Sequence, residues 1–312
     1  MEYRALGNSN LKVPVLCLGG NIFGNFCNEK ETKNIIDFAF ENGINFIDTA
    51  NVYSDGISEI FIGNALKGRR NKFIIATKAG LRSDQKPENI FTREYILKSV
   101  EESLQRLQTE YIDLYQVHNF DQSVPFKETM QTLNELVDVG KVKYIGCSNY
   151  TLTQLRKVIS LQFKHRFISI QLPYNLIDRE IELEILPLCE KEKVGVLTYH
   201  SLARGRLTGK YQNKESLPKD SRAVISASIR EKITDEVIQF SNKIKKMAET
   251  KKHSATELAI TWILFRKEIS SVIVGVRSIE QLRDCIKAVS WKLTREEMGE
   301  IENTYSFIST PT

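Results

Sequence analysis

Four polar residues in the N-terminal part of the chain combine the side-chain types that could donate a proton from a phenol. They are Asp48, Tyr53, Lys78 and His118. A free tyrosine, with a pKa near ~10, is a poor acid at neutral pH. A neighbouring ammonium favours the phenolate, so we expect Lys78 to lower the pKa of Tyr53. Asp48 could hold Lys78 and compensate its burial, and His118 could donate a hydrogen bond to an oxygen on which negative charge develops.

Each of these residues also has an ordinary structural role when it is taken alone. Asp48 is a common type of helix cap, and Tyr53 is more often a packed aromatic with a wet hydroxyl. A lysine at a strand end is usually solvated, and a single histidine such as His118 is more often structural than catalytic. The catalytic interpretation therefore depends on the elements that would bring the four side chains to one place.

Short β-rich apolar runs alternate along the chain with segments of helical period. Within Phe126–Val139, for example, apolar residues recur on one helical face. The predicted strands are Val15–Leu18, Asn45–Asp48, Phe73–Thr77, Ile112–Val117, Tyr144–Cys147, Ile168–Gln171, Gly195–Thr198 and Ser271–Val274. Eight β-α units predict an α/β fold, a closed (β/α)8 TIM barrel of parallel strands. A doubly wound open sheet is the alternative.

Polar or aromatic residues end or follow six successive predicted strands, and a glycine follows the last one, at the strand ends where barrel enzymes carry their chemistry. They are Asp48 with Tyr53, Lys78, His118, Ser148 with Asn149, Gln171, Tyr199 and, after the last strand, Gly275. We expect these residues to form one ring around one pocket. We also expect residues 1–312 to form a single domain, because no Pro/Gly/Ser-rich linker divides the chain. Met1–Val13 is expected to form an N-terminal β-hairpin across the barrel bottom, and Ser201–Ile233 a long loop at the C-terminal face.

Composition narrows the classes of function. The chain has 312 residues, of which 41% are hydrophobic and 27% charged, with a formal net charge of +5 spread in short runs. We expect no nucleic-acid binding from this distribution. Five cysteines without CxxC spacing favour free thiols in the cytoplasm and no metal site. No apolar run approaches membrane-spanning length, so no membrane association is expected.

With these residues placed, the chain closely resembles the aldo-keto reductase family, from Arg4–Gly7 to about Val289. The matching segments are Gly43–Ala50 with Tyr53, Ala76–Lys78, Asp113–His118, Gly140–Val142 leading to Gly146–Asn149, Gln171 with Tyr174 and Asn175, and Leu202–Gly205 with Leu207–Lys210. The resemblance implies a barrel that binds NADPH in extended form without a Rossmann domain. It implies hydride transfer to a carbonyl carbon of a small-molecule substrate. The family's catalytic tetrad falls on Asp48, Tyr53, Lys78 and His118.

The resemblance also implies a path for the cofactor. Nicotinamide contacts fall on Ser148, Asn149 and Gln171, and the stacking aromatic falls on Tyr199. The helix starting near Ser278 offers free N–H groups to phosphate, and Arg277 is placed to bind the 2′-phosphate, which favours NADP over NAD. The full set of expected cofactor residues is Gly20, Asn21, Ser148, Asn149, Gln171, Tyr199, His200, Leu202, Arg204, Gly205, Leu207, Gly275, Arg277, Gln281, Asp284 and Cys285.

Three positions depart from the family's pattern. Asn21 stands where many relatives have a large aromatic that lines the substrate pocket, which leaves the substrate open. His200 follows Tyr199 where serine is usual. Cys285 stands where an asparagine often helps to hold the adenine, which weakens the expected adenine contact.

We therefore predict an NADPH-dependent oxidoreductase that reduces an aldehyde, ketone or sugar carbonyl to an alcohol, with Tyr53 as the general acid. One alternative is a cofactor-sensing regulatory subunit, like the family's potassium-channel β-subunits. Another is a (β/α)8 lyase or isomerase that uses phosphate binding only. The natural substrate, the physiological direction, the strictness of the NADP preference and the oligomeric state stay open.

Overall fold

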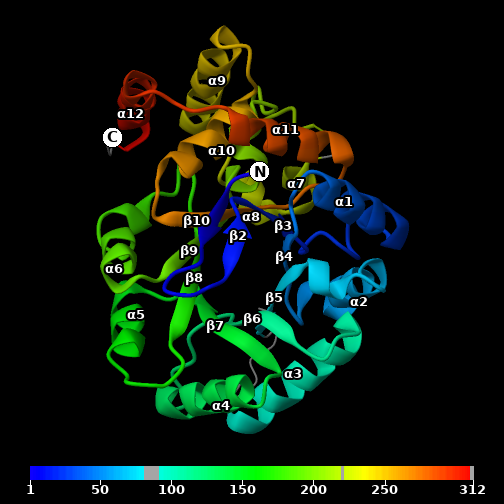
Figure 1. The fold of residues 1–312 in the computed structure, drawn as a ribbon. Coiled ribbons are helices and arrows are strands. Elements are labelled where there is room, and N and C mark those ends of the chain that lie inside the picture. The colour runs from blue at the N-terminus through cyan, green and yellow to red at the C-terminus, as the bar shows by residue number, and fades with distance from the viewer. Residues whose placement is uncertain (81–90, 219–220, 310–312) are drawn as a thin grey trace.

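Eight parallel strands close into a barrel, and the helices surround it (Figure 1). The structure is a computed structural model that describes residues 1–80, 91–218 and 221–309. The barrel strands are β3 (Leu16–Gly19), β4 (Phe46–Asp48), β5 (Ile74–Ala79), β6 (Ile112–Val117), β7 (Val142–Ser148), β8 (Phe167–Pro173), β9 (Gly195–Tyr199) and β10 (Ile269–Val274). They pair in chain order, and β10 pairs with β3 to close the ring. The predicted (β/α)8 barrel is confirmed, and the open doubly wound alternative is wrong.

The helices follow the strands along the chain, with short 3₁₀ segments between some of them. The α-helices are α1 (Glu29–Glu41), α2 (Ile57–Ala65), α3 (Arg93–Leu107), α4 (Phe126–Asp138), α5 (Leu152–Ile159), α6 (Ile185–Glu192), α7 (Arg222–Ile225), α8 (Ala227–Arg230), α9 (Asp235–Thr250), α10 (Ala255–Phe265), α11 (Ile279–Ser290) and α12 (Arg295–Ser309). The 3₁₀ segments are η1 (Tyr53–Gly56), η2 (Arg70–Lys72), η3 (Glu180–Glu182) and η4 (Ala203–Thr208).

Local sequence explains where several helices begin. The side chain of Asn28 accepts a hydrogen bond from the backbone N–H of Glu31, and the Glu31 carboxylate accepts one from the Asn28 backbone N–H, so a capping box starts α1. Thr151 and Gln154 make the same box at the start of α5. Ser278 caps α11, which confirms the helix that was expected to start near this residue.

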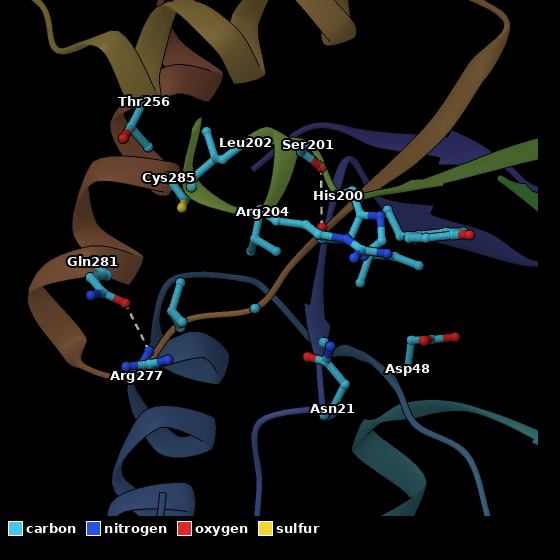
Figure 2. Close-up of a pocket in the computed structure, with 18 of the residues that line it drawn as sticks. Asn21, Asp48, His200, Ser201, Leu202, Arg204, Thr256, Arg277, Gln281 and Cys285 are labelled. Atoms are coloured by element: carbon cyan, nitrogen blue, oxygen red, sulfur yellow. Dashed lines mark hydrogen bonds between the residues drawn. The ribbon is translucent and has the colours of Figure 1, made fainter. Parts of the chain in front are cut away.

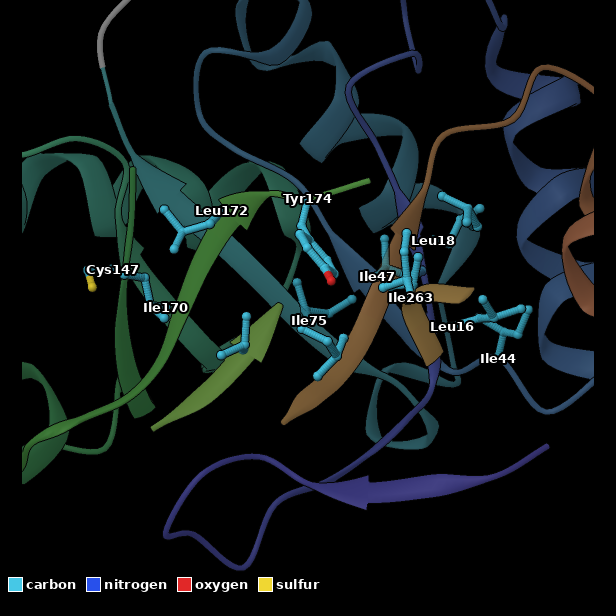
Figure 3. Close-up of a cluster of buried hydrophobic side chains, with 14 of the residues drawn as sticks. Leu16, Leu18, Ile44, Ile47, Ile75, Cys147, Ile170, Leu172, Tyr174 and Ile263 are labelled. Atoms are coloured by element: carbon cyan, nitrogen blue, oxygen red, sulfur yellow. The ribbon is translucent and has the colours of Figure 1, made fainter. Parts of the chain in front are cut away.

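Two apolar layers hold the barrel together. One fills its interior and consists of Leu6, Val13, Cys17, Phe46, Ala76, Leu114, Leu197 and Ile273. The other lies between the strands and the helices, and Figure 3 shows part of it, including Leu16, Ile75 and Ile263. Because side chains alternate across a strand, Ile75 and Ala76 of β5 belong to different layers. The same alternation sends the next two residues, Thr77 and Lys78, to opposite faces.

An antiparallel hairpin of β1 (Tyr3–Ala5) and β2 (Lys12–Pro14) lies across the barrel at the N-terminal ends of the strands (Figure 1). Leu6 and Val13 are fully buried there and close the barrel bottom. Gly7 has φ +58°, and a Cβ at this position would lie 2.2 Å from the Ile168 carbonyl oxygen, so only glycine fits. The expected hairpin is confirmed.

The segment expected to be a long loop, Ser201–Ile233, contains the short elements η4, α7 and α8. Its side chains Tyr211, Ala223, Ile229 and Ile233 pack with Ile238 of α9 in a small apolar cluster of their own. Residues 219 and 220 of this segment lie outside the described residues. Throughout the part of the chain that the structure describes, no helix combines the length and the apolar character needed to span a bilayer.

Candidate active site

The polar residues predicted to form a ring lie at the C-terminal ends of the barrel strands. Asp48 is the last residue of β4, Tyr53 begins η1, and His118 follows β6 directly. Lys78 was predicted to follow its strand, but β5 continues to Ala79 and contains it. In that register Lys78 lies opposite Gln116 of β6. The side chain of Lys78 therefore points into the barrel instead of standing on a loop.

Lys78 is the centre of a buried polar cluster. Its Nζ donates to Asp48 Oδ1 at 2.6 Å and to the Thr49 carbonyl oxygen at 2.8 Å, and lies 3.3 Å from the Tyr53 hydroxyl. The Lys78 side chain is 0% exposed and that of Asp48 is 3% exposed. Burial works to lower the pKa of Lys78, but Asp48 and Tyr53 outweigh it and hold that pKa above its ordinary value. The ammonium therefore stays charged beside the phenol.

The second oxygen of Asp48 is held by two amides that face the barrel interior. Gln171 Nε2 donates to Asp48 Oδ2 at 2.8 Å, and Gln116 Nε2 donates to the same oxygen at 3.1 Å. Sequence reasoning did not identify Gln116 as part of the site. The signal was present, because Gln116 is a polar residue in a wholly buried strand, two positions before His118 and therefore on the same face.

The net pKa of Tyr53 differs from the expectation. Burial raises it above the ordinary value, and the positive charge of Lys78 opposes that rise without overcoming it. The sequence indicated the neighbouring charge but not the degree of desolvation, so the predicted net direction was wrong. A raised pKa keeps the hydroxyl protonated, which is the state a proton donor needs.

His118 is an uncharged imidazole beside the phenol. Burial, and then the charge of Lys78, lower its pKa to about 3. Its ring lies edge-on to Tyr53, with centroids 5.9 Å apart and planes at 80°. Its Nδ1 is buried and has no hydrogen-bond partner among the described residues. A Cβ on Gly80 would lie 2.4 Å from that nitrogen, so a glycine is required there for the ring to fit.

A second group of polar residues joins the ends of β7, β8 and β9. Ser148 Oγ donates to the Gln171 carbonyl oxygen at 3.0 Å. Asn149 Nδ2 donates to the His118 carbonyl oxygen at 2.9 Å, and the Tyr199 hydroxyl donates to Asn149 Oδ1 at 2.6 Å. These bonds fix the orientation of the Asn149 amide and of the Tyr199 ring next to the buried cluster.

One cavity of about 500 Å³ connects these residues with a second, more basic region. Figure 2 shows Asp48 at one side of it and Arg277 with Gln281 at the other, with Arg204 and His200 between them. Tyr53 and His118 line the cavity, whereas Lys78 lies behind its wall. The structure therefore brings the expected catalytic and cofactor residues to one continuous space.

Among the sixteen residues expected to contact the cofactor, all but Leu207 line this cavity. Leu207 is fully buried in the outer core, so it shapes the η4 loop from beneath instead of facing the cavity. The lining residues outside this set and the expected catalytic tetrad are Gly19, Ser201, Thr208, Lys210, Thr256, Ile273, Val274 and Val276. Thr256 comes from α10, and no sequence signal pointed to it.

The η4 loop has an unusual backbone. His200, Ala203 and Arg204 have φ of 56°, 49° and 59°, a region that non-glycine residues seldom occupy. Strain of this kind concentrates at ligand-binding segments. His200, which departs from the family's serine, packs its ring edge-on against Tyr199, with centroids 4.5 Å apart.

The donor set of the cavity fits a dinucleotide with several phosphates. The cations Arg204, Lys210 and Arg277 line its basic region, where the N-terminus of α11 also lies. Backbone N–H groups at a helix start and guanidinium forks both suit phosphate oxygens. At the other side, Tyr199 offers an aromatic face beside oriented amides, as a nicotinamide ring requires.

Comparison with known proteins agrees with this geometry. Residues 15–306 match the model of the "Aldo/keto reductase family". The chain is similar to "Aldo-keto reductase YhdN" of Bacillus subtilis, with 35% identity over 98% of this chain and 95% of that protein. It is also similar to "Probable voltage-gated potassium channel subunit beta" of Arabidopsis thaliana, with 32% identity over 93% and 91%. The solved "aldo-keto reductase AKR11C1 from Bacillus halodurans (holo form)" superimposes with a TM-score of 0.81 at 31% identity, over 97% of this chain and 96% of that one.

Proposed function

The chain belongs to the aldo/keto reductase family and is an NADP-dependent oxidoreductase of carbonyl compounds. For this reaction we propose that Tyr53 is the proton donor. The substrate is an aldehyde, a ketone or a sugar carbonyl, and the product is the alcohol. One observation carries the proposal. The fully buried Lys78 Nζ lies 3.3 Å from the hydroxyl of Tyr53, and Tyr53 lines the cavity.

The proposed mechanism assigns proton transfer to this chain's own residues. Bound NADPH supplies the hydride that reduces the carbonyl carbon. The Tyr53 hydroxyl donates its proton to the carbonyl oxygen as negative charge develops there. Lys78 stabilises the phenolate that remains, and Asp48 keeps Lys78 charged and in place. The buried cluster thus holds a neutral acid before transfer and a compensated anion after it.

His118 is proposed to bind the carbonyl oxygen rather than to transfer a proton. With a pKa of about 3 its ring is neutral at physiological pH. A neutral imidazole N–H can donate a hydrogen bond to the developing oxyanion. It does so without adding a second positive charge next to Lys78, which burial would penalise.

The expected cofactor residues keep the roles that the family resemblance implies. Ser148, Asn149 and Gln171 are proposed to hold the nicotinamide amide, and Tyr199 to stack on the ring. Arg277 is proposed to bind the 2′-phosphate. The remaining cavity residues of the set are proposed to hold the pyrophosphate, ribose and adenine, and they are Gly20, Asn21, His200, Leu202, Arg204, Gly205, Gly275, Gln281, Asp284 and Cys285.

We also propose that residues 1–312 act as one domain in the cytoplasm. The match to a single family model over residues 15–306 supports one domain. The thiols of all five cysteines are free and buried, which suits a reducing compartment.

The direct test is NADPH oxidation, followed by absorbance, with a panel of aldehydes, ketones and keto-sugars. Wild-type protein is expected to oxidise NADPH with a reactive aldehyde. Tyr53→Phe removes the transferable proton and is expected to lower kcat by at least about 10³-fold, while NADPH titration by fluorescence gives an unchanged Kd. Wild-type turnover by Tyr53→Phe would overturn the assignment of the proton donor.

The similarity to a potassium-channel β-subunit keeps a second role in view, that of a cofactor-binding regulatory subunit. That role predicts tight NADPH binding with negligible turnover on every carbonyl of the panel, so the same assay separates the two. The lyase or isomerase alternative is set aside by the family match, which is to oxidoreductases.

A further inference from the structure

An aromatic ring from a distant part of the chain lies on the guanidinium of Arg277. Phe26, in the loop between β3 and α1, places its ring centroid 3.9 Å from Arg277 Cζ. Phe26 is 38% exposed, so this contact is not part of the core. A cation–π contact of this kind holds a guanidinium by its face. Such a contact occupies the face of the guanidinium and leaves the N–H groups at its edge, in the guanidinium plane, to other partners.

The loop that carries Phe26 is well held. The Phe26 backbone N–H donates to the Ile22 carbonyl oxygen at 2.9 Å, and the Gly24 N–H donates to the Cys27 carbonyl oxygen at 2.9 Å. Ile22 and Phe23 are fully buried, and Cys27 is 2% exposed. The ring of Phe26 therefore projects from a fixed support.

Arg277 is fixed on its backbone as well. Its N–H donates to Gln281 Oε1 at 2.8 Å, the bond drawn in Figure 2. Its carbonyl oxygen accepts a weak hydrogen bond from Cys27 Sγ at 3.8 Å. The loop before α1 thus holds Arg277 at two points, one on the main chain and one on the guanidinium.

We propose that Phe26 is a positioning residue that sets the preference for NADP over NAD, by holding the Arg277 guanidinium with its edge toward the 2′-phosphate. This inference rests on the proposed role of Arg277 in binding that phosphate. A free arginine side chain loses much rotamer freedom when it binds a ligand. Phe26 restricts the Arg277 side chain before the ligand binds, so less rotamer entropy is lost on binding. This increases the affinity only of ligands that carry a 2′-phosphate.

The test uses two small probes that differ by one phosphate, adenosine 2′,5′-bisphosphate and 5′-AMP, with Kd measured by calorimetry on the full chain. Phe26→Leu is expected to weaken binding of the bisphosphate by about threefold to tenfold, the range of a partly exposed cation–π contact. The same variant is expected to change the Kd of 5′-AMP by less than about twofold. This probe lacks the 2′-phosphate that Arg277 is proposed to bind. Phe26→Tyr keeps the ring face and is expected to restore the wild-type Kd.

A matched control comes from α1 and α11, the two helices that follow the segments of Phe26 and Arg277. Arg283 of α11 stacks on Phe38 of α1, with Cζ 4.8 Å from the ring centroid, and Arg283 does not line the cavity. Phe38→Leu removes a cation–π contact of the same type between α1 and α11. It is expected to leave the Kd values of both probes unchanged, which separates positioning of Arg277 from general loosening of this region.

A double-variant cycle completes the test. Arg277→Ala is expected to abolish the preference for the bisphosphate, and Phe26→Leu added to it is expected to cause no further loss. Equal weakening of both probes by Phe26→Leu, no weakening of either, or additive losses in the double variant would each overturn the role of Phe26. If the wild-type protein does not prefer the bisphosphate over 5′-AMP, the proposed role of Arg277 fails as well, so the two failures are distinct.

Discussion

Thr77 and Lys78 are neighbours in β5, and each belongs to a buried cluster of a carboxylate, a cation and a hydroxyl. On the inner face, Lys78 joins Asp48 and the hydroxyl of Tyr53. On the outer face, the Thr77 hydroxyl donates to Glu59 Oε1 at 2.6 Å, and Arg106 Nε donates to Glu59 Oε2 at 2.7 Å.

The two clusters differ in what surrounds them. The outer one ties β5 to α2 and α3, because Glu59 comes from α2 and Arg106 from α3. Glu59 is 0% exposed, and both of its oxygens are bonded. The inner cluster ends at a cavity through Tyr53. On the outer face of β5 these groups only connect elements of the fold. On the inner face a similar set of groups reaches a cavity, where a ligand could contact the Tyr53 hydroxyl.

The largest expected effect is on the inner cluster. Lys78→Met removes the charge that we propose stabilises the Tyr53 phenolate, and we expect kcat to fall by roughly 10³- to 10⁴-fold. Stability is also expected to fall by about 3 kcal/mol, because Asp48 is left buried without its cation. Steady-state kinetics and urea unfolding measure the two effects.

The matched control for this variant is Lys143→Met. Lys143 is also a strand lysine paired with an aspartate, Asp113, but its side chain is 48% exposed. We expect its kcat to stay within about twofold of wild type, because neither Lys143 nor Asp113 lines the cavity. A comparable loss of kcat in both variants would mean that Lys78 acts on the fold alone.

The outer cluster is expected to show the opposite pattern. Glu59→Gln removes the buried charge that pairs with Arg106, and we expect the free energy of unfolding to fall by about 2 to 3 kcal/mol. We expect kcat to change by less than about threefold. The same unfolding measurement on Glu101→Gln, whose ion pair with Lys141 is exposed, is expected to give a loss below about 0.5 kcal/mol. A loss of kcat in Glu59→Gln as large as in Lys78→Met would erase the distinction between the faces.

The smallest expected effect is the pH dependence of the inner face between pH 6.5 and 5. The pKa of His118 is about 3 in the folded chain and near ~6.5 in an unfolded one. As pH falls below about 6.5 the unfolded state takes up the proton first, so the folded state loses stability, by at most ~1.4 kcal/mol per pH unit, until about pH 3.

Urea unfolding between pH 6.5 and 5 keeps carboxylates with ordinary pKa values mostly ionised, and comparison with a His118 variant separates its contribution from that of the other histidines. His118→Asn is expected to flatten the decline seen for wild type in that window. If both proteins lose stability with the same slope, His118 is not held neutral by its surroundings.

The ring of polar residues was predictable because the C-terminal ends of all the barrel strands lie at the same end of a (β/α)8 barrel. Strand periodicity and the residue after each strand predicted the positions of Asp48, Tyr53, His118, Ser148 and Gln171. All of them lie at or near the C-terminal ends, although Ser148 is still the last residue of β7 and Gln171 lies two residues before the end of β8. The cofactor path followed from ordered motifs, and its residues apart from Leu207 share one cavity. These features depend on local order along the chain, which the sequence contains directly.

Other features depend on distances between segments far apart in sequence. Phe26 and Arg277 are 251 positions apart in the sequence, yet they stack, and no pattern in either segment indicates the other. The same holds for the pair of Thr77 with Glu59 and for the contact of Gln116 with Asp48. Closure of the barrel brings them together.

Strand order and residue type along the chain are enough to predict that Tyr53 and Lys78 meet at the end of a barrel. The net pKa of Tyr53 and the neutrality of His118 depend on the folded chain. Both follow from desolvation, which depends on how completely all the surrounding elements exclude water. Desolvation is a property of the assembled barrel, and no single segment of the chain contains it.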